Sequence, residues 1–265
     1  MRLSWNLGKV AGIDLYLHPS AFLIFLFAGG SGLASIGLET IALVVGLFAS
    51  IVLHELGHAL TARRYGIRTA DITLYLFGGV ARLERMPRSG GPELLIALAG
   101  PAVSFVTALS LGLLALVVSR LGQPVPGLLI ELANLNAMLG LFNLLPIFPM
   151  DGGRVLRALL SGPLGRLRAT EVAAFLGRGV AIVGGAYFLA NGMTQLVILA
   201  IFVYFAGSME LRQVRGESRA DKTLPDGLVD VPPPPAGFHW VNRGDGIWRL
   251  APIMAHVGGR DRSWS

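Results

Sequence analysis

The segment TIALVVGLFASIVLHELGHALTA, residues 40–62, is a long apolar run that carries two histidines and one glutamate near its end. A helix of about 20 apolar residues crosses the hydrocarbon layer of a bilayer, so the segment predicts a membrane-spanning helix. Ionisable side chains inside such a helix are costly and usually face a partner or a watery cavity. The segment therefore indicates a membrane protein with a polar site inside the membrane.

The rest of the 265-residue chain agrees with a membrane location. Apolar residues make up 53% of the chain, charged residues make up only 14%, and the mean hydropathy is +0.63. Soluble domains carry about 25% charged residues. Six apolar runs predict membrane spans at residues 19–37, 40–62, 93–118, 127–145, 172–190 and 193–209. The predicted fold class is an all-α polytopic membrane protein of about six transmembrane helices with a small β-type segment.

The basic residues predict the orientation, because Lys and Arg are retained on the cytoplasmic side of membranes. With the N-terminus inside, 20 of the 22 Lys and Arg residues are cytoplasmic; Arg120 lies outside and Arg178 lies within the fifth span. We expect six spans with both termini cytoplasmic, in the plasma membrane of a prokaryote. The net charge of +6 then marks topology, and nucleic acid is not an expected partner.

Two regions flank the predicted spans. Residues 1–20 have some features of a signal peptide, but alternating Ile13, Leu15 and Leu17 predict a short strand before a retained helix. Residues 1–210 are the predicted membrane domain, and residues 211–265 are a polar tail with a polyproline run at Pro232–Pro235. Within the tail, residues 237–250 (GFHWVNRGDGIWRL) predict either a hairpin around residues 244–246 or a disordered segment.

The motif His54-Glu55-Leu56-Gly57-His58 is the strongest chemical signal in the chain. Residues four apart lie on one face of a helix, so both imidazoles can bind one Zn²⁺ while the intervening Glu55 reaches a nearby water. The alternative is a metal-free cluster of hydrogen bonds between helices. The chain has no cysteine, which excludes thiolate zinc sites, cysteine nucleophiles and disulfides.

A catalytic zinc usually has three protein ligands, so a third ligand is expected elsewhere in the chain. The candidates are His18, Glu131, Asp151, His239 and His256. Asp151 follows NLLPIFPM, in which two prolines must interrupt a helix, and it precedes a glycine pair. The local pattern allows two readings, a carboxylate turned toward a metal or the N-cap of a helix that begins near Gly152.

Residues 71–84 (DITLYLFGGVARLE) have the composition of β-strands with a turn at Gly78-Gly79. Such a hairpin can offer a strand edge to an unfolded substrate, or it can be a purely structural loop.

The chain resembles the site-2 proteases, which are intramembrane zinc metalloproteases. The resemblance rests on the HExxH motif, on Asn143, Pro146, Pro149, Asp151 and Gly152, and on a Gly-rich motif at residues 100–104 (GPAVS). These motifs cover a three-helix catalytic core at about residues 40–160, and the flanking spans are similar to the six-span branch of the family. Many six-span members carry a CBS pair after the last helix, for which a tail of residues 211–265 is too short.

The resemblance implies zinc ligands His54, His58 and Asp151, one Zn²⁺ per chain, and Glu55 as general base. Asn143 is then a polar group near the site. The remaining motif residues are expected to support the site or the substrate: Gly100, Pro101, Ser104, Pro146, Pro149 and Gly152. The implied activity is hydrolysis of a peptide bond within or near the transmembrane segment of a single-pass membrane protein.

Two other functions are compatible with parts of the pattern. A metal-handling transporter can use intramembrane His, Glu and Asp side chains as a conduction path. That reading does not explain why an acid lies between two histidines at helical spacing. An inactive binding member of the protease family is the other alternative, although every expected catalytic residue is present. No residue specifies the substrate or the oligomeric state.

Overall fold

The computed structural model describes residues 4–24, 37–76, 78–84, 90–223, 238–242 and 248–252. Most of the first predicted span, residues 19–37, lies outside these ranges, as do the candidate ligand His256 and the side chain of His239. The chain divides into two units, Met1–Ser218 and Arg219–Ser265.

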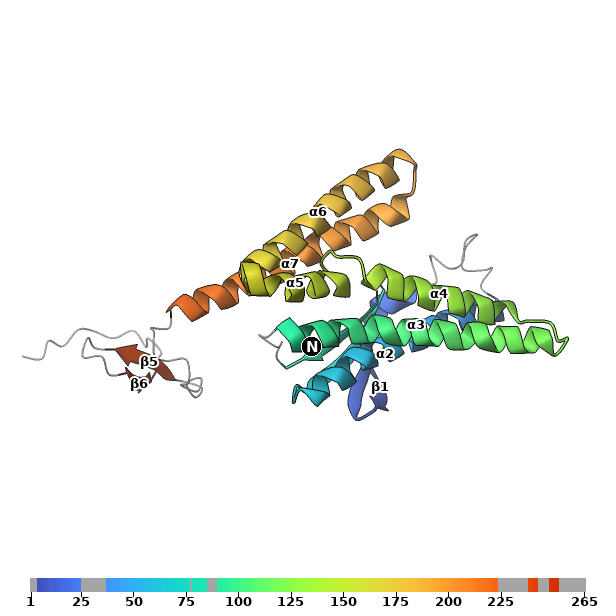
Figure 1. Cartoon of the computed structure of the whole chain (residues 1–265), viewed down its shortest axis with the longest axis horizontal. Coiled ribbons are helices and arrows are strands. Elements are labelled where there is room, and N and C mark those ends of the chain that lie inside the picture. Colours follow the sequence, from blue (N-terminus) through green and yellow to red (C-terminus); the bar gives the residue numbers. More distant parts are fainter. Residues whose placement is uncertain are drawn as a thin grey trace, which may run out of the picture. The chain divides into compact units, whose positions relative to one another are not determined.

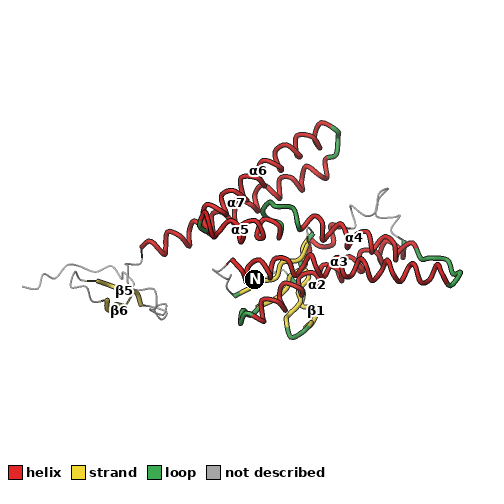
Figure 2. The backbone as a smooth tube through the Cα atoms, in the orientation of Figure 1, coloured by secondary structure: helices red, strands yellow, loops and turns green. Residues whose placement is uncertain are grey.

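Helices make up most of the first unit (Figures 1 and 2). They are the short 3-10 helix η1 (Pro19–Leu23) and the α-helices α2 (Leu38–Arg64), α3 (Gly90–Arg120), α4 (Gly127–Asn143), α5 (Asp151–Leu164), α6 (Arg166–Ala190) and α7 (Thr194–Thr223).

Four helices in the described part of the chain are long and apolar enough to cross a membrane, namely α2, α3, α6 and residues 196–216 of α7. They correspond to the second, third, fifth and sixth predicted spans. The fourth predicted span is the apolar helix α4, whose 17 residues extend about 26 Å, less than a typical crossing. Large side chains remain exposed along these helices, for example Leu109, Phe175 and Val183, as expected of surfaces that face lipid.

A four-stranded sheet completes the first unit. Its strands are β1 (Trp5–Val10), β2 (Ile13–Leu17), β3 (Thr69–Tyr75) and β4 (Gly78–Leu83), in that order. β2 pairs with β3 in parallel, and the other two pairs are antiparallel. The predicted strand at residues 13–17 is confirmed.

The hairpin predicted at residues 71–84 is also confirmed, but Gly78 and Gly79 do not form its turn. β3 ends at Tyr75, which pairs with Gly78, so both glycines belong to β4. Gly78 has a φ of +132°, a conformation that few residues other than glycine adopt, and this accounts for a glycine at the first position of the strand.

Small residues bring α2, α3 and α4 together, and Figure 2 shows these three helices close to one another. A Cβ at Gly57 of α2 would lie 2.7 Å from the carbonyl oxygen of Ala99 in α3. A Cβ at Gly140 of α4 would lie 3.0 Å from the ring of Phe105. The close contact between these helices places the middle of α2 against α3, where the polar residues of both helices meet.

The segment between α4 and α5, residues 144–150, packs against α6 and α7. Phe148 is buried with Ala173 and Leu211, and a Cβ at Gly177 would lie 2.6 Å from the Phe148 carbonyl oxygen. Because Leu211 and Val214 are buried, α7 continues past the predicted domain boundary at 210/211 and ends at Thr223.

The second unit contains β5 (Phe238–Asn242) and β6 (Trp248–Pro252), which pair antiparallel. Of the two alternatives that the sequence left open for residues 237–250, the structure shows the hairpin. The connecting residues 243–247 lie outside the described part of the chain.

Candidate metal centre

His54 and His58 occupy one face of α2, one helical turn apart, as the HExxH spacing predicts. Both side chains are buried, with 3% and 4% of their surface exposed. Their Nε2 atoms lie 3.2 Å apart, so the two imidazoles converge on one point.

Asp151 lies at the first position of α5, directly after the segment that contains Pro146 and Pro149. Its Oδ2 atom is 3.1 Å from Nε2 of His54 and 3.0 Å from Nε2 of His58. The N-cap of α5 is Met150, so the Asp151 carboxylate is free from a capping role and faces the histidines. Of the two readings that the local sequence allowed, the geometry favours the carboxylate turned toward the imidazoles.

The three donor atoms fit a zinc ion. At zinc–ligand distances of about 2.0–2.1 Å, tetrahedral ligand atoms lie about 3.3 Å apart, close to the observed separations of 3.0–3.2 Å. Two imidazoles and a carboxylate are a donor set that zinc accepts. The buried group of His54, His58 and Asp151 can therefore bind a metal ion.

Gly100 of α3 leaves room for this group. A Cβ at that position would lie 2.2 Å from Nε2 of His58 and 2.7 Å from Nε2 of His54. Its neighbour Pro101 is buried inside the same helix. Any side chain at residue 100 would occupy the space in which the imidazole nitrogens meet.

A second layer of hydrogen bonds orients the imidazoles. Nδ1 of His54 lies 2.8 Å from Oγ of the buried Ser104, and Nδ1 of His58 lies 2.7 Å from the carbonyl oxygen of Ile96. Since a carbonyl oxygen only accepts, Nδ1 of His58 donates the hydrogen and Nε2 keeps its lone pair for a metal. Ser104 thus supports the site through His54.

Glu55 points from α2 toward the sheet rather than into the group of three. Its Oε2 atom accepts a hydrogen bond of 3.2 Å from the backbone N–H of Ala81 in β4. A Cβ at Gly79 would lie 2.7 Å from Cγ of Glu55. The sequence indicated a hairpin but gave no sign of this contact, because it depends on how β4 packs against α2.

The other predicted support residues have different environments. Gly152 packs against the 144–150 segment, where a Cβ would lie 2.2 Å from the Leu145 carbonyl oxygen. Asn143 is half-buried, and its side-chain amide donates to the carbonyl oxygen of Leu139 within α4. Within the described residues, no hydrogen bond links Asn143 to the group of three. Pro146 is exposed and Pro149 is half-buried beside Asp151.

Two of the candidate ligands lie elsewhere. His18 bonds Ser20 and stacks near Tyr75, with ring centroids 5.0 Å apart. Glu131 is exposed on α4.

Sequence reasoning missed an ionic cluster around Arg157 of α5, the helix that begins with Asp151. Its other members are Glu93, which is buried, and Glu210 and Arg166, which are half-buried. Arg157 of α5 is fully buried, donates to Glu93 of α3 at 2.6 Å and to Glu210 of α7 at 2.7 Å, and lies over the ring of Phe148. The sequence offers no local signal for this cluster, because its members lie more than 50 residues from Arg157 and meet it only through packing of the helices, apart from Arg166 on the next helix.

A second missed contact joins α4 to α2. The buried amide of Asn136 donates to Oγ of Ser50 at 2.8 Å, one turn before His54. Polar side chains in two apolar helices were the available signal, since such groups usually bond to each other within a membrane.

Comparison with known proteins agrees with this geometry. The model of peptidase family M50 matches residues 42–127 and 121–184, which include the three converging side chains and more than half of the chain. The chain belongs to peptidase family M50. Together with its four apolar helices, membership of this family identifies an integral membrane protein.

The relatives of this M50 chain extend the match. A zinc metalloprotease of Methanocaldococcus jannaschii is 39% identical over 224 residues, which cover 82% of this chain and 63% of that protein. Rip3 of Mycobacterium tuberculosis is 36% identical over 274 residues, which cover 94% of this chain and 69% of Rip3. The chain therefore spans about two thirds of the length of these relatives.

The fold matches a solved M50 structure as well. The structure of the site-2 protease from Methanocaldococcus jannaschii has a TM-score of 0.63 and 38% sequence identity, and the match covers 78% of this chain and 95% of that one. The predicted membership in the site-2 protease family is confirmed.

Proposed function

We propose that this chain is an intramembrane zinc endopeptidase that hydrolyses a peptide bond within or near the transmembrane segment of a single-pass membrane protein. One observation carries the proposal: the buried side chains of His54, His58 and Asp151 bring their donor atoms together. The two histidines flank Glu55 on the membrane-spanning helix α2. No comparable observation supports a metal-handling transporter. The described residues contain one group of possible metal ligands, whereas a conduction path needs a series of them.

His54, His58 and Asp151 hold the ion in this account, and zinc bound there would polarise the peptide carbonyl and supply a nucleophile from water at neutral pH. Ser104 and the Ile96 carbonyl keep the imidazoles in the orientation that binding requires. Three protein ligands leave one position for water or substrate.

Glu55 acts as the general base. It accepts the proton of the attacking water and delivers it to the leaving amine nitrogen, so that water is consumed and no acyl-enzyme forms. The N–H of Ala81 holds one carboxylate oxygen, Oε2. The other oxygen, Oε1, makes no hydrogen bond within the described residues and is available to take the proton.

The position of β4 supports the strand-edge role of the hairpin. β4 is the last strand of the sheet, and it contacts α2 at the catalytic glutamate. A substrate segment that has unwound from its helix needs partners for its backbone N–H and C=O groups, and an open strand edge supplies them. An extended substrate paired with β4 would run past Glu55.

The distribution of basic residues supports a cytoplasmic location for both termini and for the C-terminal end of α2, where Arg63 and Arg64 lie. Water would then reach the site from the cytoplasm.

The proposal is tested by reconstituting the full chain in liposomes with candidate single-pass proteins. We expect cleavage within or near the substrate's transmembrane segment, its loss when a chelator removes the metal, and its return with added zinc. A parallel assay measures zinc flux across the same liposomes. Zinc flux without cleavage would support the transporter and refute the peptidase, and zinc-dependent binding of substrate without cleavage would indicate the inactive family member.

A further inference from the structure

Arg178 lies on helix α6, six residues inside the predicted membrane span 172–190, and has no role in the proposed peptidase mechanism. It is half-buried, and no carboxylate among the residues that the structure describes pairs with it. A charged side chain within a membrane helix is costly unless it reaches a partner or the interface. The position of Arg178 therefore calls for an anionic partner.

The guanidinium of Arg178 points toward the N-terminal end of α6. Its Nε donates to the carbonyl oxygen of Ala174, one turn earlier, at 3.3 Å. That direction leads to the membrane face where Arg166 and Arg168 lie at the beginning of the helix. Within the described part of the chain, its two Nη groups make no hydrogen bond, so they can bind an anion that approaches from that face.

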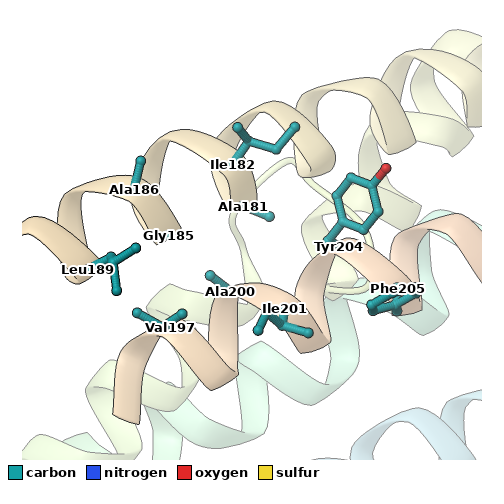
Figure 3. A pocket seen from close by; sticks show the side chains of 10 residues that line it. All are labelled: Ala181, Ile182, Gly185, Ala186, Leu189, Val197, Ala200, Ile201, Tyr204 and Phe205. Atoms are coloured by element: carbon teal, nitrogen blue, oxygen red, sulfur yellow. The ribbon is translucent and has the colours of Figure 1, made fainter. Parts of the chain in front are cut away.

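The face of α6 that carries Arg178 also lines a groove, which begins one helical turn further along the helix. Ala181 and Ile182 follow Arg178 at three and four residues, which is one helical turn. A groove of about 280 Å³ begins there and runs between α6 and α7 (Figure 3). Its lining consists of Ala181, Ile182, Gly185, Ala186, Leu189, Val197, Ala200, Ile201, Tyr204 and Phe205.

The groove is apolar except at the end near Arg178. There the ring of Tyr204 rises from α7 beside Ala181 and Ile182, and its hydroxyl points toward α6 (Figure 3). The hydroxyl group makes no hydrogen bond within the described residues, so a hydrogen-bond donor is available where the groove begins, one helical turn after Arg178. One end of the groove thus suits an anionic head, and the remainder suits a hydrocarbon chain.

We propose that this groove binds an anionic phospholipid, with its phosphate at Arg178, an ester carbonyl at Tyr204 and one acyl chain between α6 and α7. Guanidinium binds phosphate through two parallel hydrogen bonds, and no carboxylate among the described residues pairs with Arg178. An acidic residue on a substrate helix fits less well. A helix about 10 Å wide fills about 420 Å³ per turn, which exceeds the whole groove of about 280 Å³.

The test measures lipids retained by the purified full chain in native mass spectrometry. The probes are phosphatidylglycerol and phosphatidylcholine with identical acyl chains. We expect preferential retention of phosphatidylglycerol, and we expect Arg178→Ala to reduce that preference about tenfold, the usual consequence of losing hydrogen bonds to a charged group. Arg178→Lys should preserve part of the preference, because the charge remains and the two-pronged geometry is lost.

Two further variants separate a specific groove from general attraction. Arg168→Ala removes an exposed cation from the same helix outside the groove and should leave the preference unchanged. Ala186→Leu fills the groove and should reduce retention of both lipids while Arg178 is intact. An unchanged zinc content in each variant shows that the fold is preserved.

The proposal is overturned if Arg178→Ala leaves phosphatidylglycerol retention unchanged, or if Arg168→Ala reduces it equally. It is also overturned if Arg178→Ala weakens only the binding of a substrate helix that carries an acidic residue, since the substrate would then be the partner of Arg178.

Discussion

At the scale of single residues, the metal centre needs free space around the imidazole nitrogens as well as its three ligands. Gly100→Ala would place a methyl group 2.2 Å from Nε2 of His58, so we expect at least a tenfold fall in zinc affinity and a matching loss of activity. Gly112→Ala is the matched control, because a Cβ on that residue of α3 meets no atom within 4 Å. Metal analysis of both purified variants measures the effect, and equal zinc content would contradict it.

Ser104 provides a second test at this scale. Ser104→Ala removes the hydrogen bond to Nδ1 of His54, and loss of such a supporting bond typically costs 10- to 100-fold in metal affinity or activity. Ser110→Ala is its control, since that exposed hydroxyl bonds only the Val106 carbonyl oxygen of its own helix. We expect zinc titration to show weaker binding for the first variant alone, and an equal effect of both would exclude an orienting role for Ser104.

The sequence was most informative about residues whose geometry is local. The turn of helix between His54 and His58 follows from a spacing of four residues. The approach of Asp151 to those histidines spans 97 residues of chain and depends on how α5 packs, so the local pattern left its role open between ligand and cap. The hydrogen bond from Ala81 to Glu55 depends on tertiary packing in the same way.

At the scale of elements, the ionic cluster around Arg157 joins α5, which carries Asp151, to α3 and α7. Arg157→Ala would leave the carboxylate of Glu93 buried without its main partner, so we expect a loss of about 3–5 kcal/mol in the free energy of unfolding. Arg168→Ala, on exposed surface, should change it by less than about 0.5 kcal/mol. Thermal unfolding in detergent compares them, and similar melting temperatures would show that the cluster does not hold α5.

Apolar runs of about 20 residues predicted most of the helices, because a segment that crosses the lipid must be apolar over that length. These runs identified α2, α3, α6 and α7, and composition identified the hairpin of β3 and β4. The two glycines that were predicted to form the turn belong to β4 instead, where Gly78 has a φ of +132°. The extension of α7 to Thr223 was missed because most residues after Glu210 are polar. The two buried apolar residues, Leu211 and Val214, are too few to stand out in the sequence.

At the scale of the whole molecule, Glu55 and both histidines of the site lie on the membrane-spanning helix α2, so the proposed peptidase requires a substrate helix to unwind before its backbone reaches Glu55. Substrates with Gly, Pro or Asn near the cut should be cleaved faster than versions in which Leu or Ala strengthens the helix. We expect at least a tenfold difference in initial rate between matched reporters in liposomes. The same substitutions placed at the far end of the reporter helix are the control. Equal rates for weakened and strengthened helices would contradict a requirement for unwinding.

The most direct test of the account compares wild type with Glu55→Gln in one experiment that records both zinc content and cleavage of a single-pass substrate. Glu55 lies outside the group of three donors, so both proteins should hold one zinc ion per chain. Only the wild type should cleave, because the variant lacks the base that accepts the proton from water. Cleavage by Glu55→Gln at the wild-type rate, or a wild type that cleaves without bound metal, would contradict the central claim.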